Sequence, residues 1–267
     1  MSESATGRGD DGSPPSVGRT AEPGRVRAVL AEVDAVGGFF TVTTRDAEAA
    51  DPTWRPLATM LAVPAHGPDP LGERLAAVAD GLGADRRVAA SLLAQSVASR
   101  SVSVLLAAAA LGVLPDLAPS SVLHARPWAG GPLPLWADPA QLTGADLAAT
   151  APDDAAAVLA DVLAREQIAP LVAGIRARAS VSARLLWGNA ASALAGAVRV
   201  LGDARPDLHA PALALARGVL THESFAGLGA FVPDPAHPSG LGFARRTCCL
   251  YYRVDGGGKC ADCLLRA

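Results

Sequence analysis

The stretch CCLYYRVDGGGKCADC, residues 248–263, decides how the end of this chain folds, because it holds all four cysteines of the 267 residues. Cys248, Cys249, Cys260 and Cys263 follow one another in the order C-C-x10-C-x2-C. Four thiolates complete the coordination of one tetrahedral zinc ion or of the two irons of a [2Fe-2S] cluster. The stretch therefore predicts a metal centre.

The spacing favours a [2Fe-2S] cluster over zinc. Cys260 and Cys263 form the C-x2-C pair in which a tight turn directs two sulfurs to one metal ion. Cys248 and Cys249 are neighbours whose side chains diverge in extended backbone, and two irons accommodate diverging thiolates more readily than one ion does. Structural zinc, disulfides and a free redox thiol stay open as alternatives. Disulfides are the weakest of these, because we expect a cytoplasmic chain whose thiols are kept reduced.

Two runs of sequence resemble a known family. RTCCLYYR at residues 246–253, followed by GGGKCADC at residues 256–263, resembles the C-terminal [2Fe-2S] motif of the FhuF-like ferric iron (siderophore) reductases. LWGNAASAL at residues 186–194 is similar to an internal Trp-Gly-Asn segment that these proteins carry before the cluster region. The two resemblances together cover residues 180–267.

The resemblance implies a function in iron uptake. It implies a cytoplasmic oxidoreductase that passes one electron from a [2Fe-2S] cluster to Fe(III) held by a siderophore, and so releases Fe(II). The cluster ligands would be Cys248, Cys249, Cys260 and Cys263. The partners would be a ferric siderophore and an electron donor such as a ferredoxin or a ferredoxin reductase system. The competing hypotheses are a metal-knuckle binding or sensing module and an electron shuttle without ferric reductase activity.

Charge is distributed unevenly along the chain. Residues 245–267 carry a formal balance of +3, whereas the whole chain is −3 and residues 1–244 are therefore −6. Positive charge beside the cysteines would attract an anionic ferric chelate or an acidic ferredoxin, or would simply neutralise an anionic cluster. The docking candidates on this segment are Arg245, Arg246, Arg253 and Lys259.

Three side chains outside this segment are further candidates for contact with a substrate: Arg100, Trp187 and Asn189. Arg100 is the sole charge in a long apolar stretch, so a buried position would require a carboxylate or a cage of carbonyls, and it could equally bind a siderophore carboxylate. Trp187 lies among leucines at helical spacing, which is typical of a core residue. Trp187 and Asn189 could also contact the cluster segment.

Other cofactors and partners are not indicated. No G-x-G-x-x-G turn follows a predicted strand, so we expect no flavin or NAD site. Aromatic residues make up 4% of the chain and do not alternate with basic residues, so nucleic acid is not expected as a partner.

Composition and periodicity predict an α-rich α+β fold: a helical body with a few short strands and a small C-terminal metal-organised segment. We expect a flexible tail at residues 1–22, a substrate-holding helical body at 23–224, a Gly/Pro-rich linker at 225–244 and the cluster-binding segment at 245–267. Helices are expected at residues 22–36, 71–81, 84–114, 153–178, 182–201 and 211–222, and strands at 39–44, 122–126 and 133–136.

One apolar run could be mistaken for a membrane span. Residues 102–114 are uncharged, but a spanning helix needs about 20 residues, and Arg100 and Pro115 bound the run. The run therefore predicts a buried helix, and the protein is not expected to be an integral membrane protein. Because residues 1–22 lack the apolar core of a signal peptide, we expect a cytoplasmic location.

Overall fold

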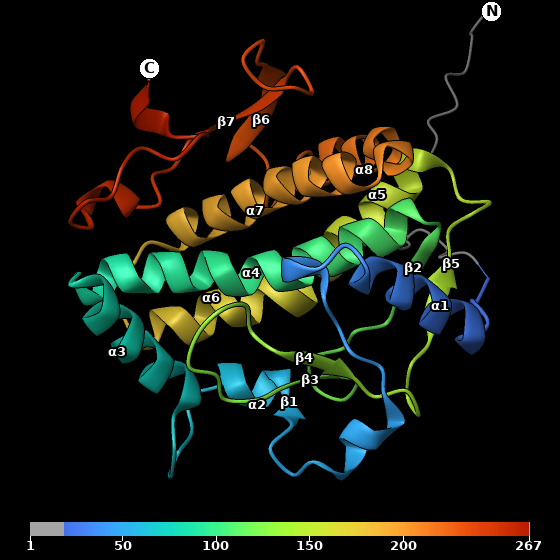
Figure 1. Cartoon of the computed structure of the whole chain (residues 1–267), viewed down its shortest axis with the longest axis horizontal. Coiled ribbons are helices and arrows are strands. Elements are labelled where there is room, and N and C mark those ends of the chain that lie inside the picture. The colour runs from blue at the N-terminus through green and yellow to red at the C-terminus, as the bar shows by residue number, and fades with distance from the viewer. Residues whose placement is uncertain (1–18, 267) are drawn as a thin grey trace, which may run out of the picture.

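Two long helices form the centre of the molecule (Figure 1). The structure, a computed structural model, describes residues 19–266. Helix α4 (Arg86–Ala110) packs along helix α7 (Ala183–Ala204), and alanines on the buried faces of both helices allow their backbones to approach closely. The Asp85 side chain begins α4 by accepting a hydrogen bond from the Val88 N–H at 2.9 Å. The expected α-rich α+β fold is thus confirmed.

Shorter helices surround this pair. Helices α3, α6 and α8 all pack on α4, which is why α4 is buried along most of its length. A π-helical turn (Val162–Ile168) joins α5 to α6 just before Pro170, whose nitrogen has no hydrogen to donate, and the wider turn absorbs that missing bond. The surrounding helices are α1 (Pro23–Asp34), α2 (Leu57–Leu61), α3 (Pro70–Leu82), α5 (Pro152–Asp161), α6 (Ala169–Arg176) and α8 (Pro206–Val219).

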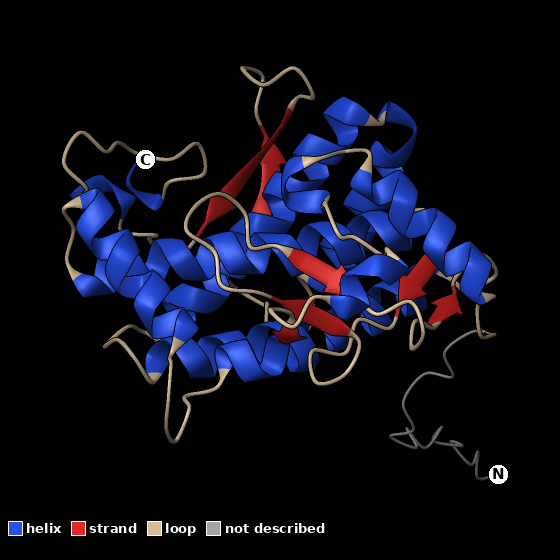
Figure 2. Cartoon of the chain, turned by 60° about the horizontal axis from the view of Figure 1, so that its bottom comes forward, coloured by secondary structure: helices blue, strands red, loops and turns tan. Residues whose placement is uncertain are grey.

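Short antiparallel strands complete the fold, and Figure 2 shows them at separate places around the helices. Three strands pair in the order β1-β3-β4, and two further pairs are β2 with β5 and β6 with β7. Pro134 precedes β4 at the edge of its sheet, where the missing N–H is tolerated. The strands are β1 (Arg55–Pro56), β2 (Val113–Pro115), β3 (Leu123–Ala125), β4 (Leu135–Ala137), β5 (Gly144–Asp146), β6 (Gly229–Pro233) and β7 (Leu241–Arg245).

Most predicted elements are present, and three expectations within the helical body were wrong. Residues 39–44 are not a strand, because Gly37 and Gly38 have positive φ and the chain makes a 3-10 turn at Gly38–Phe40. The helix expected to reach residue 114 ends at Ala110, since Gly112 turns the chain with φ 83° into β2. The helix expected from residue 211 already begins at Pro206, at the position where the fixed φ of proline suits a helix start.

Parts of the predicted tail, residues 1–22, and of the predicted linker, residues 225–244, pair with strands. Residues 1–18 lie outside the described residues, but Arg19 and Ala21 bond to β5, with Ala21 N–H to Gly144 O at 2.9 Å. The predicted linker at residues 225–244 instead holds the β6–β7 hairpin, whose Phe231 and Phe243 rings pack with centroids 5.5 Å apart. Pro235, Pro238 and Gly240 lie in the turn of this hairpin, where Gly240 has φ 66°.

Helices α4 and α7 are both long and apolar enough to cross a membrane by length and composition alone. In α4, 78% of the most apolar window is buried inside the protein, and in α7 the share is 72%. The predicted burial of residues 102–114 is confirmed for the part that lies in α4, where residues 102–109 are buried. Both helices therefore have the character of core helices, as in a soluble protein.

Candidate metal centre

The four cysteines lie in the C-terminal segment, which packs beside the first halves of α4 and α7 (Figure 1, red). All four are free thiols; Cys249 is buried, and the other three are half-buried. The Sγ atoms of Cys249 and Cys260 are 3.7 Å apart. In the part of the chain that the structure describes, no three His, Cys, Asp or Glu side chains gather closely enough to hold one metal ion.

The backbone around each cysteine pair is bent. Leu250 adopts φ 68°, and within residues 19–266 it is the one non-glycine residue with positive φ. Its N–H points to the Cys248 Sγ at 3.4 Å. At the second pair, the Cys263 N–H bonds to the Cys260 carbonyl at 3.1 Å, which is the tight turn predicted for C-x2-C. The chain therefore bends directly after the first pair and within the second.

The glycine run between the two pairs closes a turn. Gly256 has φ 71°, and a Cβ on Gly257 would lie only 2.5 Å from the Tyr251 carbonyl oxygen. These two positions therefore require glycine, whereas a Cβ on Gly258 would meet nothing within 4 Å. The run brings the chain back from Tyr251–Arg253, a 3-10 turn, to Cys260.

The surroundings of Cys260 disfavour a thiolate in the absence of a metal. Burial, the Asp262 carboxylate and Cys249 all raise the pKa of the Cys260 thiol. A metal ion reverses this preference, because its positive charge stabilises the thiolate. This site is therefore expected to release protons when metal binds.

A buried polar network attaches the cysteine segment to the two central helices. Arg245, whose side chain is 0% exposed, donates from Nη2 to the Asn189 Oδ1 at 2.5 Å. Asn189 donates in turn to the Ser91 carbonyl at 2.8 Å and the Ser91 Oγ at 3.0 Å. The Ser91 hydroxyl donates to the Cys249 carbonyl at 2.7 Å. We call Arg245, Asn189 and Ser91 the docking network.

Asp262 provides a second attachment, between the last two cysteines. Its carboxylate accepts a hydrogen bond from the Ser192 hydroxyl of α7 and lies 3.9 Å from the Arg245 Nη1. Arg245 Nη1 and Nε are buried and have no hydrogen-bond partner among residues 19–266. Two buried donors of a cation at this place fit a site for an anionic, sulfur-rich group, because sulfur ligands accept such hydrogen bonds.

The predicted Trp-Gly-Asn segment contacts the cysteine segment through its glycine. A Cβ on Gly188 would lie 1.9 Å from the Thr247 Oγ1, so only glycine allows residue 247 to pack here. Trp187 is half-buried, and its ring meets Phe225 edge-on with centroids 5.3 Å apart. Asn189 and Gly188 thus contact the cluster segment, one of the two roles expected for this motif.

Arg100 and Arg245 are enclosed by the protein. Arg100 is 2% exposed and donates from Nε to the Leu133 carbonyl at 2.8 Å and from Nη1 to the Gly38 carbonyl at 3.0 Å, with Nη2 on the Thr41 carbonyl. Burial lowers its pKa to about 10, a value at which it still carries its charge at neutral pH. The carbonyl cage expected for a buried Arg100 is thus present. Arg245 is buried as well, with Nη2 bonded to Asn189. Contact of either arginine with a substrate or an electron donor stays a prediction.

The other basic candidates lie at the surface. Arg246 and Arg253 are exposed, and Arg253 stacks on the Tyr252 ring and donates to its hydroxyl at 3.1 Å. Lys259 is exposed as well, and its ammonium donates to the Leu265 carbonyl. Of the predicted docking residues, these three are placed where a partner could reach them.

A cavity of about 510 Å³ opens beside the cysteine segment, with Cys260 and Asp262 in its wall. Polar side chains of α4 line one side, and the Phe231 and Phe243 rings of the hairpin line another. The polar lining from α4 is Gln95, Ser99 and Ser103. The cavity therefore has room for a small molecule beside a cysteine of the predicted cluster.

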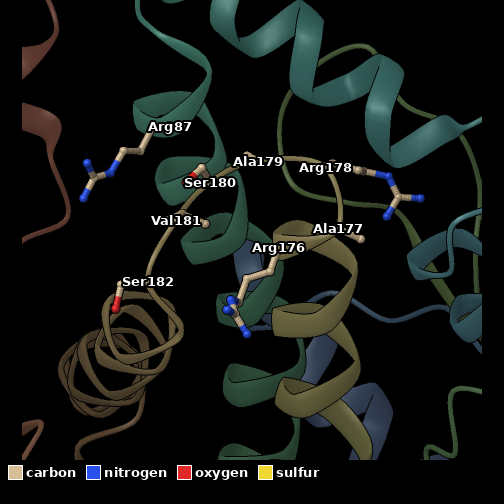
Figure 3. Close-up of a pocket in the computed structure, with 8 residues that line it drawn as sticks. All are labelled: Arg87, Arg176, Ala177, Arg178, Ala179, Ser180, Val181 and Ser182. Atoms are coloured by element: carbon tan, nitrogen blue, oxygen red, sulfur yellow. The ribbon is translucent and has the colours of Figure 1, made fainter.

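A second hollow, of about 730 Å³, lies between the end of α6 and the start of α7 (Figure 3). Arg87, Arg176 and Arg178 are among the residues that line it. The Arg178 guanidinium points away from the other two and pairs with Asp69, with Nη2 and Oδ1 2.6 Å apart. None of its eight lining residues belongs to the cysteine segment. The cavity beside Cys260 is therefore the better candidate for redox chemistry.

Several residues of the site were not predicted from the sequence. Ser91 lies in no motif, and Ser192 and Thr247 lie within the two quoted runs but were not singled out there. Only the fold brings the two serines to the cysteine segment. Asp262 could have been noticed, since it lies between two predicted ligands.

The comparison with protein families agrees with this geometry. The family model described as "FhuF 2Fe-2S C-terminal domain" matches residues 245–263. The C-terminal segment is therefore FhuF-like and carries the iron–sulfur motif of that family, as the resemblance predicted. The match ends there and leaves the helical residues before Arg245 unmatched. A comparison with curated proteins found no match.

Proposed function

We propose that this protein is a cytoplasmic ferric-siderophore reductase. In this proposal Cys248, Cys249, Cys260 and Cys263 hold a [2Fe-2S] cluster, and the helical body holds the ferric chelate. The family match to a 2Fe-2S domain supports the first part. The absence, among residues 19–266, of a three-ligand group favours two irons with two thiolates each over one zinc ion with four.

One observation carries the assignment of a reductase: the 510 Å³ cavity shares Cys260 and Asp262 with the cysteine segment. Small-molecule sites typically have volumes of about 300–1,000 Å³. Hydroxyl and amide groups of α4 would hydrogen-bond to a polar chelate, and the two phenylalanine rings of the hairpin would cover its apolar parts. A chelate bound there would lie against a cluster ligand.

The chemistry required of the protein is modest. When bound, the cluster supplies one electron, which reduces the chelated Fe(III) to Fe(II) and is replaced by an external donor of the ferredoxin type. Oxygen ligands of siderophores bind the hard Fe(III) ion far better than Fe(II), so reduction loosens the chelate. The protein has to bind the chelate, hold it close and exclude water. The exposed Arg246 and Arg253 would attract an acidic donor to the cysteine segment.

The test is iron release from a ferric siderophore under anaerobic conditions. The chemically reduced protein is mixed with the chelate and a ferrous-specific chromogenic chelator, and Fe(II) is followed in stopped flow. We expect about one Fe(II) per reduced protein. A rate no greater than that of a variant with all four cysteines replaced by serine would contradict the proposal.

A cavity variant separates binding from electron supply. Gly196 lines the cavity, and a Cβ there would meet nothing within 4 Å, so Gly196→Phe should fill the cavity without disturbing α7. We expect slower Fe(II) release with an unchanged cluster spectrum. The matched control is Gly81→Phe on α3, where a Cβ also meets nothing within 4 Å and which is not among the residues that line this cavity. Equal rates of Fe(II) release in both variants would show that the chelate does not bind in this cavity. A purified protein that contains one zinc ion and no iron would favour a metal-knuckle binding module.

A further inference from the structure

The four cysteines can be divided between two irons in three ways, and the structure distinguishes these divisions. The Cys249 and Cys260 sulfurs, 3.7 Å apart, come from opposite halves of the motif. Two sulfurs bound to one tetrahedral metal at about 2.3 Å lie about 3.8 Å apart. The separation of this pair is therefore the one that a shared metal ion requires.

The backbone explains why neighbouring cysteines do not form the short pair. After Cys249 the chain enters the left-handed conformation at Leu250, and the Leu250 N–H points to the Cys248 sulfur at 3.4 Å. Cys249 is buried: its carbonyl accepts a hydrogen bond from the Ser91 hydroxyl, and the residue is only 4% exposed. Cys248 is therefore the outer and Cys249 the inner member of the first half.

The second half of the motif also has one inner and one outer cysteine. The Cys260 sulfur faces Cys249, and Cys260 also lines the cavity. The Cys263 sulfur accepts from the Leu265 N–H at 3.4 Å, the same arrangement that Leu250 makes with Cys248. Each half of the motif thus provides one cysteine to the inner pair and leaves one cysteine with a local N–H donor.

We propose that Cys249 and Cys260 bind one iron and that Cys248 and Cys263 bind the other. This inference rests on the proposed [2Fe-2S] cluster. It differs from the simplest division, in which Cys248 and Cys249 share one iron and Cys260 and Cys263 share the other. In the crossed division each iron ties the two halves of the motif together, so both metal ions close the loop of residues 250–259. The iron held by Cys249 and Cys260 is the one beside the cavity.

Three double variants, each containing Cys248→Ser, test the three divisions. A serine oxygen in place of a cysteine sulfur changes the isomer shift of the iron that it binds. Two oxygens on one iron therefore give the two ferric sites unequal isomer shifts, whereas one oxygen on each iron leaves the two shifts similar. The proteins are enriched in ⁵⁷Fe and studied oxidised by Mössbauer spectroscopy. We expect the largest inequality, relative to the unsubstituted protein, in C248S/C263S. The largest inequality in C248S/C249S or in C248S/C260S would overturn the crossed division.

A second measurement does not depend on cluster assembly in a variant. The metal-free full chain is oxidised with diamide, which takes two hydrogens from a pair of thiols, and is digested with trypsin after Arg253 and Lys259. Peptide masses separate disulfides within a peptide from those between peptides, and tandem mass spectra with backbone cleavage between Cys248 and Cys249 and between Cys260 and Cys263 then locate the joined cysteines. We expect Cys249 joined to Cys260 as the main product, and a main product within either tryptic peptide would contradict the proposed pairing. A failure of the proposed function can be distinguished from a failure of this pairing, because the purified protein would then contain no iron and no sulfide.

Discussion

The helical body and the C-terminal cysteine segment are held together by different forces. In the body, α4 and α7 bury leucine, valine and alanine side chains against each other and against α8. The cysteine segment buries few apolar side chains, and Tyr251, Tyr252 and Leu264 are exposed. It is attached mainly through Arg245, Asn189 and the other polar contacts of the docking network.

This difference predicts two levels of stability in one chain. The stabilisation of the body is proportional to the apolar area that it buries and does not need a metal. A segment of some twenty residues with few apolar contacts cannot offset the entropy cost of its own ordering without one. Changes to the body should therefore alter global unfolding, and changes to the docking network should alter metal retention.

Removal of the metal should have the largest effect. In the metal-free protein we expect residues 246–263 to lose nearly all protection from amide hydrogen exchange, while α4 and α7 keep theirs. Hydrogen exchange followed by mass spectrometry, with and without metal, measures both regions in one sample. Equal protection of the segment in the two samples would show that the polar contacts alone order it.

A core substitution should act on the body alone. Leu105 in α4 is 0% exposed, and Leu105→Ala should lower the free energy of unfolding by about 2–5 kcal/mol, because it leaves a cavity. Urea unfolding followed by circular dichroism gives this value, and visible absorbance per chain in native buffer should not change. Val200→Ala is the control, since Val200 is 47% exposed. Loss of the visible absorbance before urea is added would contradict the separation of the two levels.

Asn189→Ala should act on the cysteine segment. The substitution leaves donors of Arg245 and the Ser91 oxygens without their partner, which costs about 1–3 kcal/mol. We expect the iron–sulfur absorbance to bleach about tenfold faster in excess chelator, since about 1.4 kcal/mol corresponds to a factor of ten. Gln141→Ala, at an exposed amide, is the control. A fall in helix stability with an unchanged bleaching rate would assign Asn189 to the core instead.

Gly188→Ala should have a similar but smaller effect. The new methyl group would meet the Thr247 side chain at 1.9 Å, and overpacking of this kind costs about 1–3 kcal/mol. Gly196→Ala on the same helix is the matched control, because open space surrounds it and alanine favours the helix by up to about 1 kcal/mol. Thermal bleaching should occur at a lower temperature in Gly188→Ala only. Identical curves for the two variants would show that Thr247 moves aside at little cost.

The smallest expected effect is a pH dependence confined to the body. The Arg178 hydrogen bonds lower the pKa of Asp69 below its ordinary value of 3.8. The unfolded chain therefore binds the proton more tightly, and the stabilisation is complete above about pH 3.8 and disappears as the pH falls through the folded value. Asp69→Asn should cost up to about 1 kcal/mol at pH 7 and nothing at low pH, measured by urea unfolding of the metal-free chain. A constant difference across the pH range would exclude the ion pair as the cause.

The sequence predicted the helical architecture and the iron–sulfur motif because both depend on local patterns. Spacing of apolar residues located α1, α3 and α7 closely, and the cysteine spacing located the candidate metal centre. The carbonyl contacts of Arg100 and the Arg245–Asn189 hydrogen bond could not be read in this way, since these partners lie 33 to 62 residues away in the chain. The hairpin at residues 229–245 was missed because glycine and proline are common to linkers and turns.

The carbonyl cage of Arg100 bears on the order in which the site assembles. Its partners Gly38 and Thr41 flank Phe39 and Phe40, and residues 36–40 form part of the cavity wall. All these contacts lie within the helical body and involve no cysteine. This wall can therefore form during folding of the body, so that metal loading completes a recess already partly shaped.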